Sequence, residues 1–186
     1  MNIWEIHPDA LPENRNKRGG AGISEPLNFR EEPLPTDPAG IREIVESSGF
    51  FHPAEIEVAC ELVLERLSKG IASGYHFLFA EERGRVVGYT CFGPIPCTLH
   101  SYDLYWIAVH NARRGEGVGR DLLTRTERII MGMGGARIYV ETSSRDLYQP
   151  TNAFYRASGY RIETTLMDFY APGDGKVIFL KILPCL

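Results

Sequence analysis

The chain has 186 residues, 44% of them hydrophobic and 24% charged, with a formal net charge of −4. This length fits one well-packed domain, and the composition excludes a mostly disordered chain. The acidic balance argues against a nucleic-acid-binding protein, and no apolar run reaches the length that crosses a bilayer. The N-terminus also lacks the order of a secretory signal, so we expect a cytoplasmic protein with no membrane partner.

Cysteine and histidine are scattered along the chain. The four cysteines, at positions 60, 91, 97 and 185, and the five histidines show no spacing typical of a metal site, so we expect no metal. A catalytic thiol at Cys91 or Cys97 would need an activating partner, and the sequence shows none beside either residue. Buried or incidental thiols are the simpler interpretation.

Residues 1–26 differ from the rest of the chain. Proline, asparagine and glycine recur there and interrupt any periodic pattern, which predicts an extended N-terminal arm. From residue 27 to residue 186 the patterns become regular, and we expect a single domain over this range.

The predicted elements follow one another closely from residue 27 onward. Period-two apolar alternation predicts strands, and apolar spacing of three to four residues predicts helices. In chain order these are a strand at 27–33, helices at 38–48 and 53–70, strands at 75–81, 86–92 and 102–109, a helix at 117–133, a strand at 137–143, a helix at 151–158, and strands at 160–170 and 177–182. This mixed order predicts an α/β or α+β sheet with helices on its faces.

A glycine-rich stretch joins the strand ending at Val109 to the next helix. Residues 111–123 read NARRGEGVGRDLL, with two arginines followed by glycines at three alternate positions. A helix start offers unpaired N–H donors, glycine lets an anion approach the backbone, and arginine adds fixed charge. The stretch therefore predicts a phosphate-binding loop, with a plain glycine-rich turn as the alternative.

Two common phosphate loops do not fit this stretch. A dinucleotide fingerprint would need glycine or alanine at Arg120, or at Leu122 if it began two residues later. A Walker loop would need a GK[ST] ending, which the stretch lacks.

Arg114-x-x-Gly117-x-Gly119 is similar to the (Q/R)xxGx(G/A) signature of the GNAT superfamily of N-acetyltransferases. A second stretch, YQPTNAFYRASGY at 148–160, resembles the family's helix with an FY pair closed by glycine and an aromatic residue. The resemblance runs from about residue 27 to the C-terminus. It implies a mixed, mostly antiparallel sheet of about seven strands flanked by about four helices on both faces, and acetyl-CoA as the cofactor, with coenzyme A as the product.

The resemblance also implies which residues hold acetyl-CoA. Backbone groups of Ile107, Ala108 and Val109 would pair with the pantetheine arm as an added strand does, and would polarise the thioester. Asn152 would hydrogen-bond the same arm or only help to start its helix, and both readings stay open. The pyrophosphate loop would comprise Arg114, Gly115, Glu116, Gly117, Val118, Gly119 and Arg120.

Tyr155 is the candidate proton donor. It lies where the resembling family often has a tyrosine beside the coenzyme sulfur, and a phenol of ordinary pKa, about 10, is protonated at neutral pH. Its hydroxyl could therefore hydrogen-bond the departing thiolate. A half-buried core tyrosine is the alternative, since Phe154 and Tyr160 are near in sequence.

The general base is sought among carboxylates. Asp103 occupies a position where some members of the family have a glutamate, and in an unbulged strand it shares a face with Tyr105, Ile107 and Val109. Glu141 on the next strand is the alternative base. For either carboxylate, an ion pair or a solvated strand end is the competing interpretation.

The acceptor site is expected between the loop at 47–52 and the hairpin at 168–174. Phe50, Phe51 and Tyr170 would form aromatic walls near carboxylates, which suits a small cationic amine. The expected partner is therefore a small-molecule or peptide amine rather than nucleic acid, and a homodimer is left open. A non-catalytic acyl-CoA-binding sensor or regulatory module is the alternative function.

Overall fold

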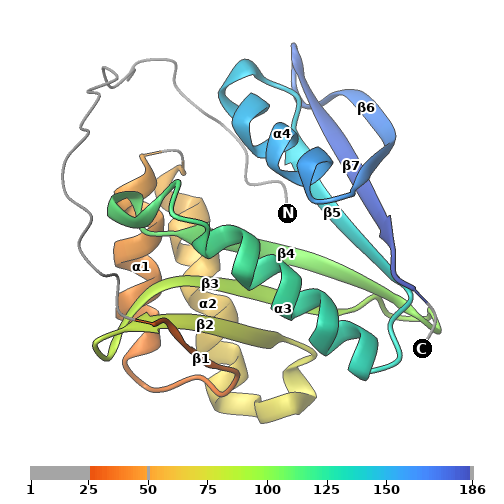
Figure 1. Ribbon diagram of the computed structural model, residues 1–186. Helices are drawn as coiled ribbons and strands as arrows, with labels where there is room; N and C mark the ends of the chain where they lie inside the picture. The colour runs from red at the N-terminus through yellow and green to blue at the C-terminus, as the bar shows by residue number, and fades with distance from the viewer. Residues whose placement is uncertain (1–25, 50, 185–186) are drawn as a thin grey trace.

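A computed structural model describes residues 26–49 and 51–184 of the chain. These residues form one sheet of seven strands in the order β1-β2-β3-β4-β5-β7-β6 (Figure 1). The strands are β1 (Asn28–Arg30), β2 (His76–Glu82), β3 (Arg85–Pro94), β4 (Ser101–Val109), β5 (Arg137–Ser143), β6 (Arg161–Ala171) and β7 (Asp174–Ile182). The α-helices are α1 (Asp37–Ser48), α2 (Pro53–Lys69), α3 (Val118–Gly132) and α4 (Gln149–Ala157). Three short 3₁₀ turns are η1 (Gly70–Ser73), η2 (Asn111–Arg113) and η3 (Asp146–Tyr148).

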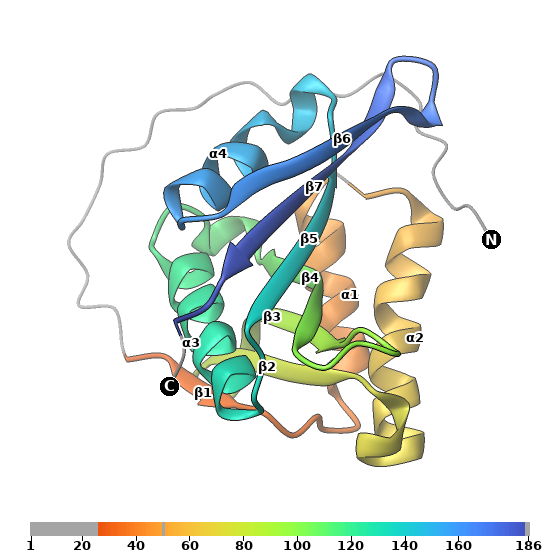
Figure 2. The same cartoon turned by 90° about the vertical axis from the view of Figure 1, so that its right-hand side faces the viewer.

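The helices cover both faces of the sheet. Helices α1 and α2 lie on one face and α3 and α4 on the other, and Figure 2 shows the strands between the two pairs. Each pair of neighbouring strands is antiparallel except β4 and β5, which run parallel. The predicted fold class, a mixed and mostly antiparallel sheet of about seven strands with about four helices, is confirmed.

Apolar residues alternate between the two faces and form a core on each. The core under α1 and α2 includes Ile41, Val45, Val63, Phe77 and Tyr89. The core under α3 and α4 includes Leu104, Ile130, Ile138, Tyr155 and Phe179. Because adjacent strand residues point to opposite faces, this alternation fixes which side chains of β4 and β5 meet which helices.

Two predicted boundaries differ from the structure. The strand predicted at 27–33 is confined to β1, because the Arg30 guanidinium binds both Glu81 of β2 and Asp37 of α1 and the chain then turns toward that helix. The last strand begins at Asp174 rather than Val177, because the turn before it is tight, with Gly173 in the left-handed region at φ 81°. Both differences come from contacts between segments distant in sequence or from turn geometry.

A β-bulge in β4 changes which residues share a face. Cys91 of β3 lies opposite Trp106, and Phe92 lies opposite Leu104, so Tyr105 is the extra residue. Asp103 and Tyr105 therefore point to the face of α1 and α2, whereas Ile107 and Val109 point to the face of α3 and α4. The expectation that all four side chains share one face assumed a strand without a bulge, and for this strand it is wrong.

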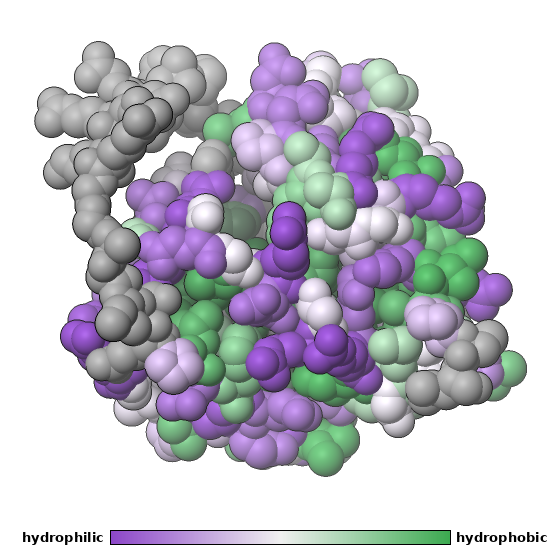
Figure 3. All heavy atoms as spheres, in the orientation of Figure 1, coloured by the Kyte–Doolittle hydropathy of each residue, from purple (hydrophilic) through white to green (hydrophobic). Residues whose placement is uncertain are grey.

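None of the helices in the described ranges is both long enough and apolar enough to cross a membrane. The outward surface of α3 is instead polar, with Asp121, Arg125 and Arg128 exposed. In the view of Figure 3 this helix crosses a surface on which hydrophilic residues predominate and hydrophobic ones are scattered.

Candidate active site

Strands β4 and β5 separate soon after they meet. They pair only over Ser101–Asp103 and Arg137–Tyr139. Beyond Asp103, β4 continues to pair with β3 through Val109, but its other edge faces no strand among the described residues. The backbone of Ile107, Ala108 and Val109 thus has one edge available for hydrogen bonds with an extended ligand.

The glycine-rich loop lies directly after this edge. Gly115 and Gly117 adopt φ values of 80° and 91°, a region that other residues rarely adopt, and Gly117 caps the start of α3 with no side-chain cap. An added Cβ at either glycine would meet no atom within 4 Å, so both backbones face open space. The first N–H groups of α3 are therefore placed to receive an anion.

The two arginines of this loop differ in their surroundings. Arg113 is engaged by Glu82 at 3.3 Å and by Glu116 at 3.1 Å, so it anchors the loop to the end of β2. Arg114 and Arg120 are exposed. Arg113 thus has a carboxylate partner on each side, and Arg114 is the arginine that occupies the first position of the signature.

Gly119 has a packing role distinct from that of the other two glycines. Its φ is helical, and an added Cβ would lie 3.7 Å from Val109 Cγ2 and 3.8 Å from Phe154 Cε2. The first turn of α3 therefore lies beside the end of β4 and helix α4, at a distance where a Cβ would make ordinary van der Waals contact. This contact brings together the two stretches of the chain that carried the sequence signatures.

Asn152 does not occupy the cap position of α4. Tyr148 occupies the N-cap position of α4 and gives no side-chain cap, so the interpretation that Asn152 starts the helix is not supported. Asn152 is buried, and its Oδ1 atom has no hydrogen-bond partner within the described part of the chain. A buried, unpaired amide oxygen is costly unless a ligand or water satisfies it.

Tyr155 lies in the core beneath α3 and α4. Its ring contacts Tyr160 and Phe179, each with a centroid separation of 5.5 Å. The same cluster contains Leu104 and Val140, the first residues of β4 and β5 beyond their paired segment. Burial raises the pKa of Tyr155 far above its ordinary value, so its hydroxyl keeps its proton at any physiological pH.

Asp103 is the carboxylate with the more suitable environment for a base. It is half-buried at the last paired position of β4, on the face of α1 and α2. Burial and, to a smaller extent, Glu141 raise its pKa to about 6, while Lys176 acts in the opposite direction. Among the described residues its carboxylate has no hydrogen bond or ion pair, so it is free to bind a water or an amine.

Glu141 is instead committed to an ion pair. Its Oε2 atom lies 2.6 Å from Lys176 Nζ, and half of its side chain is exposed. Lys176 in turn lies 4.0 Å above the ring of Phe169. The ion-pair interpretation of Glu141 is therefore the one that the geometry favours, and Asp103 is the candidate carboxylate without such a partner among the described residues.

The chain matches known proteins along most of its length. A solved structure of a GNAT-family protein from Desulfovibrio desulfuricans is 44% identical, covers 84% of this chain and 99% of its own, and superposes with a TM-score of 0.83. The profile described as an acetyltransferase (GNAT) domain matches residues 73–162. The chain belongs to the GNAT family. It therefore carries an acetyltransferase domain of this family.

Two further relatives are more distant from this GNAT chain. The Bacillus subtilis protein YuaI, described as an uncharacterised N-acetyltransferase, is 31% identical over 83 residues, which are 44% of this chain and 46% of that relative. The chain thus matches less than half the length of that relative. An aminoglycoside 6′-N-acetyltransferase solved with coenzyme A is 18% identical, covers 86% of this chain and 99% of its own, and has a TM-score of 0.68, a likeness of fold alone.

The expected acceptor walls are only partly in place in this GNAT domain. Phe51 packs against Trp106, with ring centroids 5.0 Å apart, and so belongs to the core under α1 and α2. Phe50 lies outside the described residues. Tyr170 is partly buried, and burial together with the neighbouring Glu141 raises its pKa. Of the three aromatic residues, Tyr170 is the one placed near Glu141 and its partner Lys176.

Sequence reasoning missed three polar residues on the same face of the GNAT sheet. They lie on α2 and in and just before η3, and they are Glu55, Arg145 and Tyr148. Asp174, which pairs with Arg145, ends the hairpin that was expected to border the acceptor site. Glu55 has a weak sequence signal, because it is the third residue after the N-cap His52, the position of a capping carboxylate. Their association depends on contacts across the fold, which no local pattern reveals.

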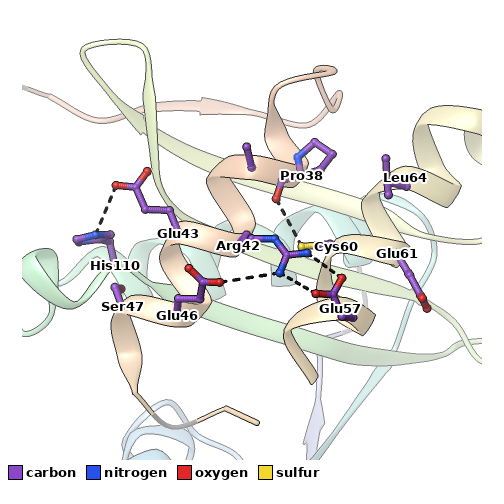
Figure 4. Close-up of a pocket in the computed structure, with 11 residues that line it drawn as sticks. Pro38, Arg42, Glu43, Glu46, Ser47, Glu57, Cys60, Glu61, Leu64 and His110 are labelled. Atoms are coloured by element: carbon purple, nitrogen blue, oxygen red, sulfur yellow. Dashed lines mark hydrogen bonds and ion pairs between the residues drawn. The ribbon is translucent and has the colours of Figure 1, made fainter. Parts of the chain in front are cut away.

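A groove between α1 and α2 lies on the outer side of these helices and apart from Asp103, Tyr155 and the glycine loop. Figure 4 shows Arg42 within it, directed at Glu57 and Glu46, with N–O distances of 2.7 Å and 3.9 Å. These pairs are exposed and contribute little to stability. Among the described residues, no cluster of histidine, cysteine and carboxylate side chains could hold a metal ion.

Proposed function

We propose that the protein is an acetyl-CoA-dependent N-acetyltransferase that passes an acetyl group directly to a primary amine of a small molecule or peptide. The observation that carries this proposal is the position of the side chains of Tyr155 and Asp103, which lie on opposite faces of the sheet near the point where β4 and β5 separate. Tyr155 belongs to the core on the side of the glycine loop, and Asp103 faces the opposite side.

The residues present fit acetyl-CoA. The open space at Gly115 and Gly117, the start of α3 and the unpaired Oδ1 of Asn152 suit a phosphorylated, amide-containing ligand. We propose that residues 114–120 hold the pyrophosphate and that Asn152 and the free edge at 107–109 hold the pantetheine arm. When bound, acetyl-CoA supplies an acetyl group activated as a thioester.

In this proposal Asp103 and Tyr155 each transfer one proton of the reaction. Asp103, deprotonated above about pH 6, accepts the proton of the attacking amine through a water molecule. The Tyr155 hydroxyl donates a hydrogen bond, and finally its proton, to the departing sulfur. Backbone N–H groups at 107–109 donate to the carbonyl oxygen as negative charge develops on it. One proton passes from the amine to Asp103 and one from Tyr155 to the thiolate, so the net charge of the two side chains is unchanged. A proton then returns from Asp103 to Tyr155 through solvent, which restores both groups.

A coenzyme A release assay tests this proposal. Acetyl-CoA is incubated with the protein and a panel of amines, amino acids, aminoglycosides and short peptides, and the acetylated product is identified by mass spectrometry. We expect release that depends on one class of amine and gives one acetylated product per thiol. Tight acetyl-CoA binding without amine-dependent release from any panel member would favour the acyl-CoA sensor instead.

A further inference from the structure

Three buried polar atoms from separate segments lack hydrogen-bond partners on the acceptor face of the sheet. They are Oε1 of Glu55, Nη2 of Arg145 and the hydroxyl oxygen of Tyr148, and within the described ranges none has a partner. A buried polar atom left unpaired destabilises a fold, because it has lost its hydrogen bonds to water without replacing them. Three such atoms together indicate a position that a ligand completes.

Glu55 has one oxygen occupied and one free. Its Oε2 atom accepts a hydrogen bond from the backbone N–H of His52 at 2.7 Å and so caps α2. The residue is only 3% exposed, so its Oε1 atom cannot reach bulk water. Capping explains why a carboxylate stands here, but an exposed cap would serve that purpose equally well.

The Arg145 guanidinium likewise has one edge that is paired and one that is not. Its Nε atom lies 3.1 Å from Oδ2 of Asp174, whose other oxygen accepts a hydrogen bond from Ser143. The guanidinium carbon lies 5.7 Å from the ring centroid of Tyr148, and Arg145 acts to lower the pKa of the Tyr148 hydroxyl, against the larger effect of burial. The two groups are therefore neighbours, but neither Nη2 nor the hydroxyl completes a hydrogen bond among the described residues. Asp174 therefore fixes one edge of the guanidinium and leaves the other edge available.

This cluster adjoins the proposed catalytic centre. Tyr170 lies within electrostatic reach of Glu55, Tyr148 and Asp174 on one side and of Glu141 on the other. Glu141 is in turn the carboxylate that acts on Asp103. Lys176 lies 2.6 Å from Glu141 and 5.9 Å from the ring centroid of Tyr170, so Glu141 and Tyr170 are near the same cation.

We propose that Glu55, Arg145 and Tyr148 form a specificity subsite that binds a neutral carboxamide carried by the acceptor beyond its reactive amine. The inference rests on the proposed function, because it places the amine of the same molecule at Asp103. The amide N–H donates to Glu55 Oε1, and the amide oxygen accepts from Arg145 Nη2 and from the Tyr148 hydroxyl.

Charge separates this ligand from its closest alternatives. An ammonium group would satisfy Glu55 but would lie beside the free edge of the Arg145 guanidinium. A carboxylate would satisfy Arg145 and Tyr148 but would meet Glu55. A methyl group would leave all three polar atoms unpaired. A carboxamide satisfies each of them, because it presents a donor and an acceptor side by side.

Binding of matched amines tests the subsite. Linear primary amines of three to six carbons ending in carboxamide, ammonium, carboxylate or methyl are titrated by calorimetry into the protein saturated with coenzyme A. At the best chain length we expect the carboxamide to bind roughly tenfold more tightly than each of the other three, the difference expected for one well-satisfied buried polar group. Equal binding, or tighter binding of the diamine or the amino acid, would overturn the inference and leave a trapped water as the partner of these atoms.

Two variants keep the test independent of folding. Glu55→Gln preserves an oxygen for the His52 cap but places a donor where Oε1 accepted, and Tyr148→Phe removes the hydroxyl alone. Both should abolish the carboxamide preference while the methyl-terminated amine binds as before. Matched controls are Glu61→Gln, an exposed position on the same helix, and Tyr102→Phe on the opposite face, which should keep the preference.

Turnover measured with the same amines separates this inference from the proposed function. Acetylation of all four amines at equal kcat/KM, with equal binding, would contradict the subsite and support the transferase. A carboxamide preference in binding with no acetylation of any amine would support the subsite and contradict the transferase.

Discussion

The two faces of the sheet, near the point where β4 and β5 separate, are built in different ways. On the face of α3 and α4, short continuous stretches at 107–120 and 152–155 supply the candidate coenzyme site, largely through backbone groups and glycines. On the face of α1 and α2, the polar side chains come from five separate segments, at Glu55, Asp103, Glu141, Arg145 to Tyr148, and Tyr170 to Asp174.

This difference means that the coenzyme site tolerates few substitutions, whereas the acceptor site can change through single side chains. A coenzyme held by backbone N–H groups needs particular φ values and close packing, and few residues satisfy these needs. An acceptor held by side chains can change when one side chain changes, with the fold preserved. We infer that acceptor specificity in this chain is set on the face of α1 and α2.

The largest expected effect concerns Tyr155, which lies on the coenzyme face but acts through a side chain. Tyr155→Phe should lower turnover by roughly 10²- to 10⁴-fold, the usual contribution of one general acid, with little change in acetyl-CoA affinity. Single-turnover kinetics and calorimetry measure the two effects. Unchanged single-turnover rates would remove Tyr155 from the chemistry and leave it as a core residue.

A smaller effect is expected from a change in the backbone of the coenzyme face. Gly117→Val should weaken acetyl-CoA binding at least tenfold, about 1.4 kcal/mol, because the side chain would enter the open space at φ 91° that the phosphates are proposed to occupy. Titration calorimetry measures the loss.

Gly134→Val is the matched control for this change. Gly134 has φ 84° and equally open surroundings, but it lies after α3 and away from the loop. It should suffer similar backbone strain, visible as a lower unfolding temperature, and bind acetyl-CoA normally. Equal loss of binding in both variants would show that strain, and not blocked access, explains the result at Gly117.

The smallest expected effect comes from the face of α1 and α2 and is a shift in the pH dependence of the acetylation rate. Glu141 raises the pKa of Asp103, so Glu141→Gln should lower that pKa, and the acid limb of the rate profile should move to lower pH. Release of Lys176 from its ion pair acts in the same direction. Complete loss of the limb in this variant would assign the base to Glu141 instead.

The glycine loop could be predicted from sequence because all its determinants lie within a few residues. Positive φ at Gly115 and Gly117 follows from local pattern, and so does the helix start that they precede. The proximity of Gly119 to Phe154, which brings the two signatures together, depends on the fold and was not predicted from the sequence.

The acceptor face could not be predicted to the same extent. The bulge at Tyr105 carries no glycine or proline that would reveal it, yet it decides which side chains accompany Asp103. The unpaired atoms of Glu55, Arg145 and Tyr148 depend on burial by segments 90 or more residues apart, which no periodicity encodes. The preference between Asp103 and Glu141 likewise required the position of Lys176.

The pH dependence of kcat/KM for the amine, compared between the natural chain and Asp103→Asn, tests the central claim most directly. Asp103 must lose its proton to act as a base, so the natural chain should gain activity as pH rises through about 6. The Asp103→Asn variant should lack this limb and should bind acetyl-CoA with unchanged affinity, since the carboxylate faces away from the coenzyme side. An identical limb in both proteins would contradict the account, because the acceptor face would then hold no carboxylate base at this position.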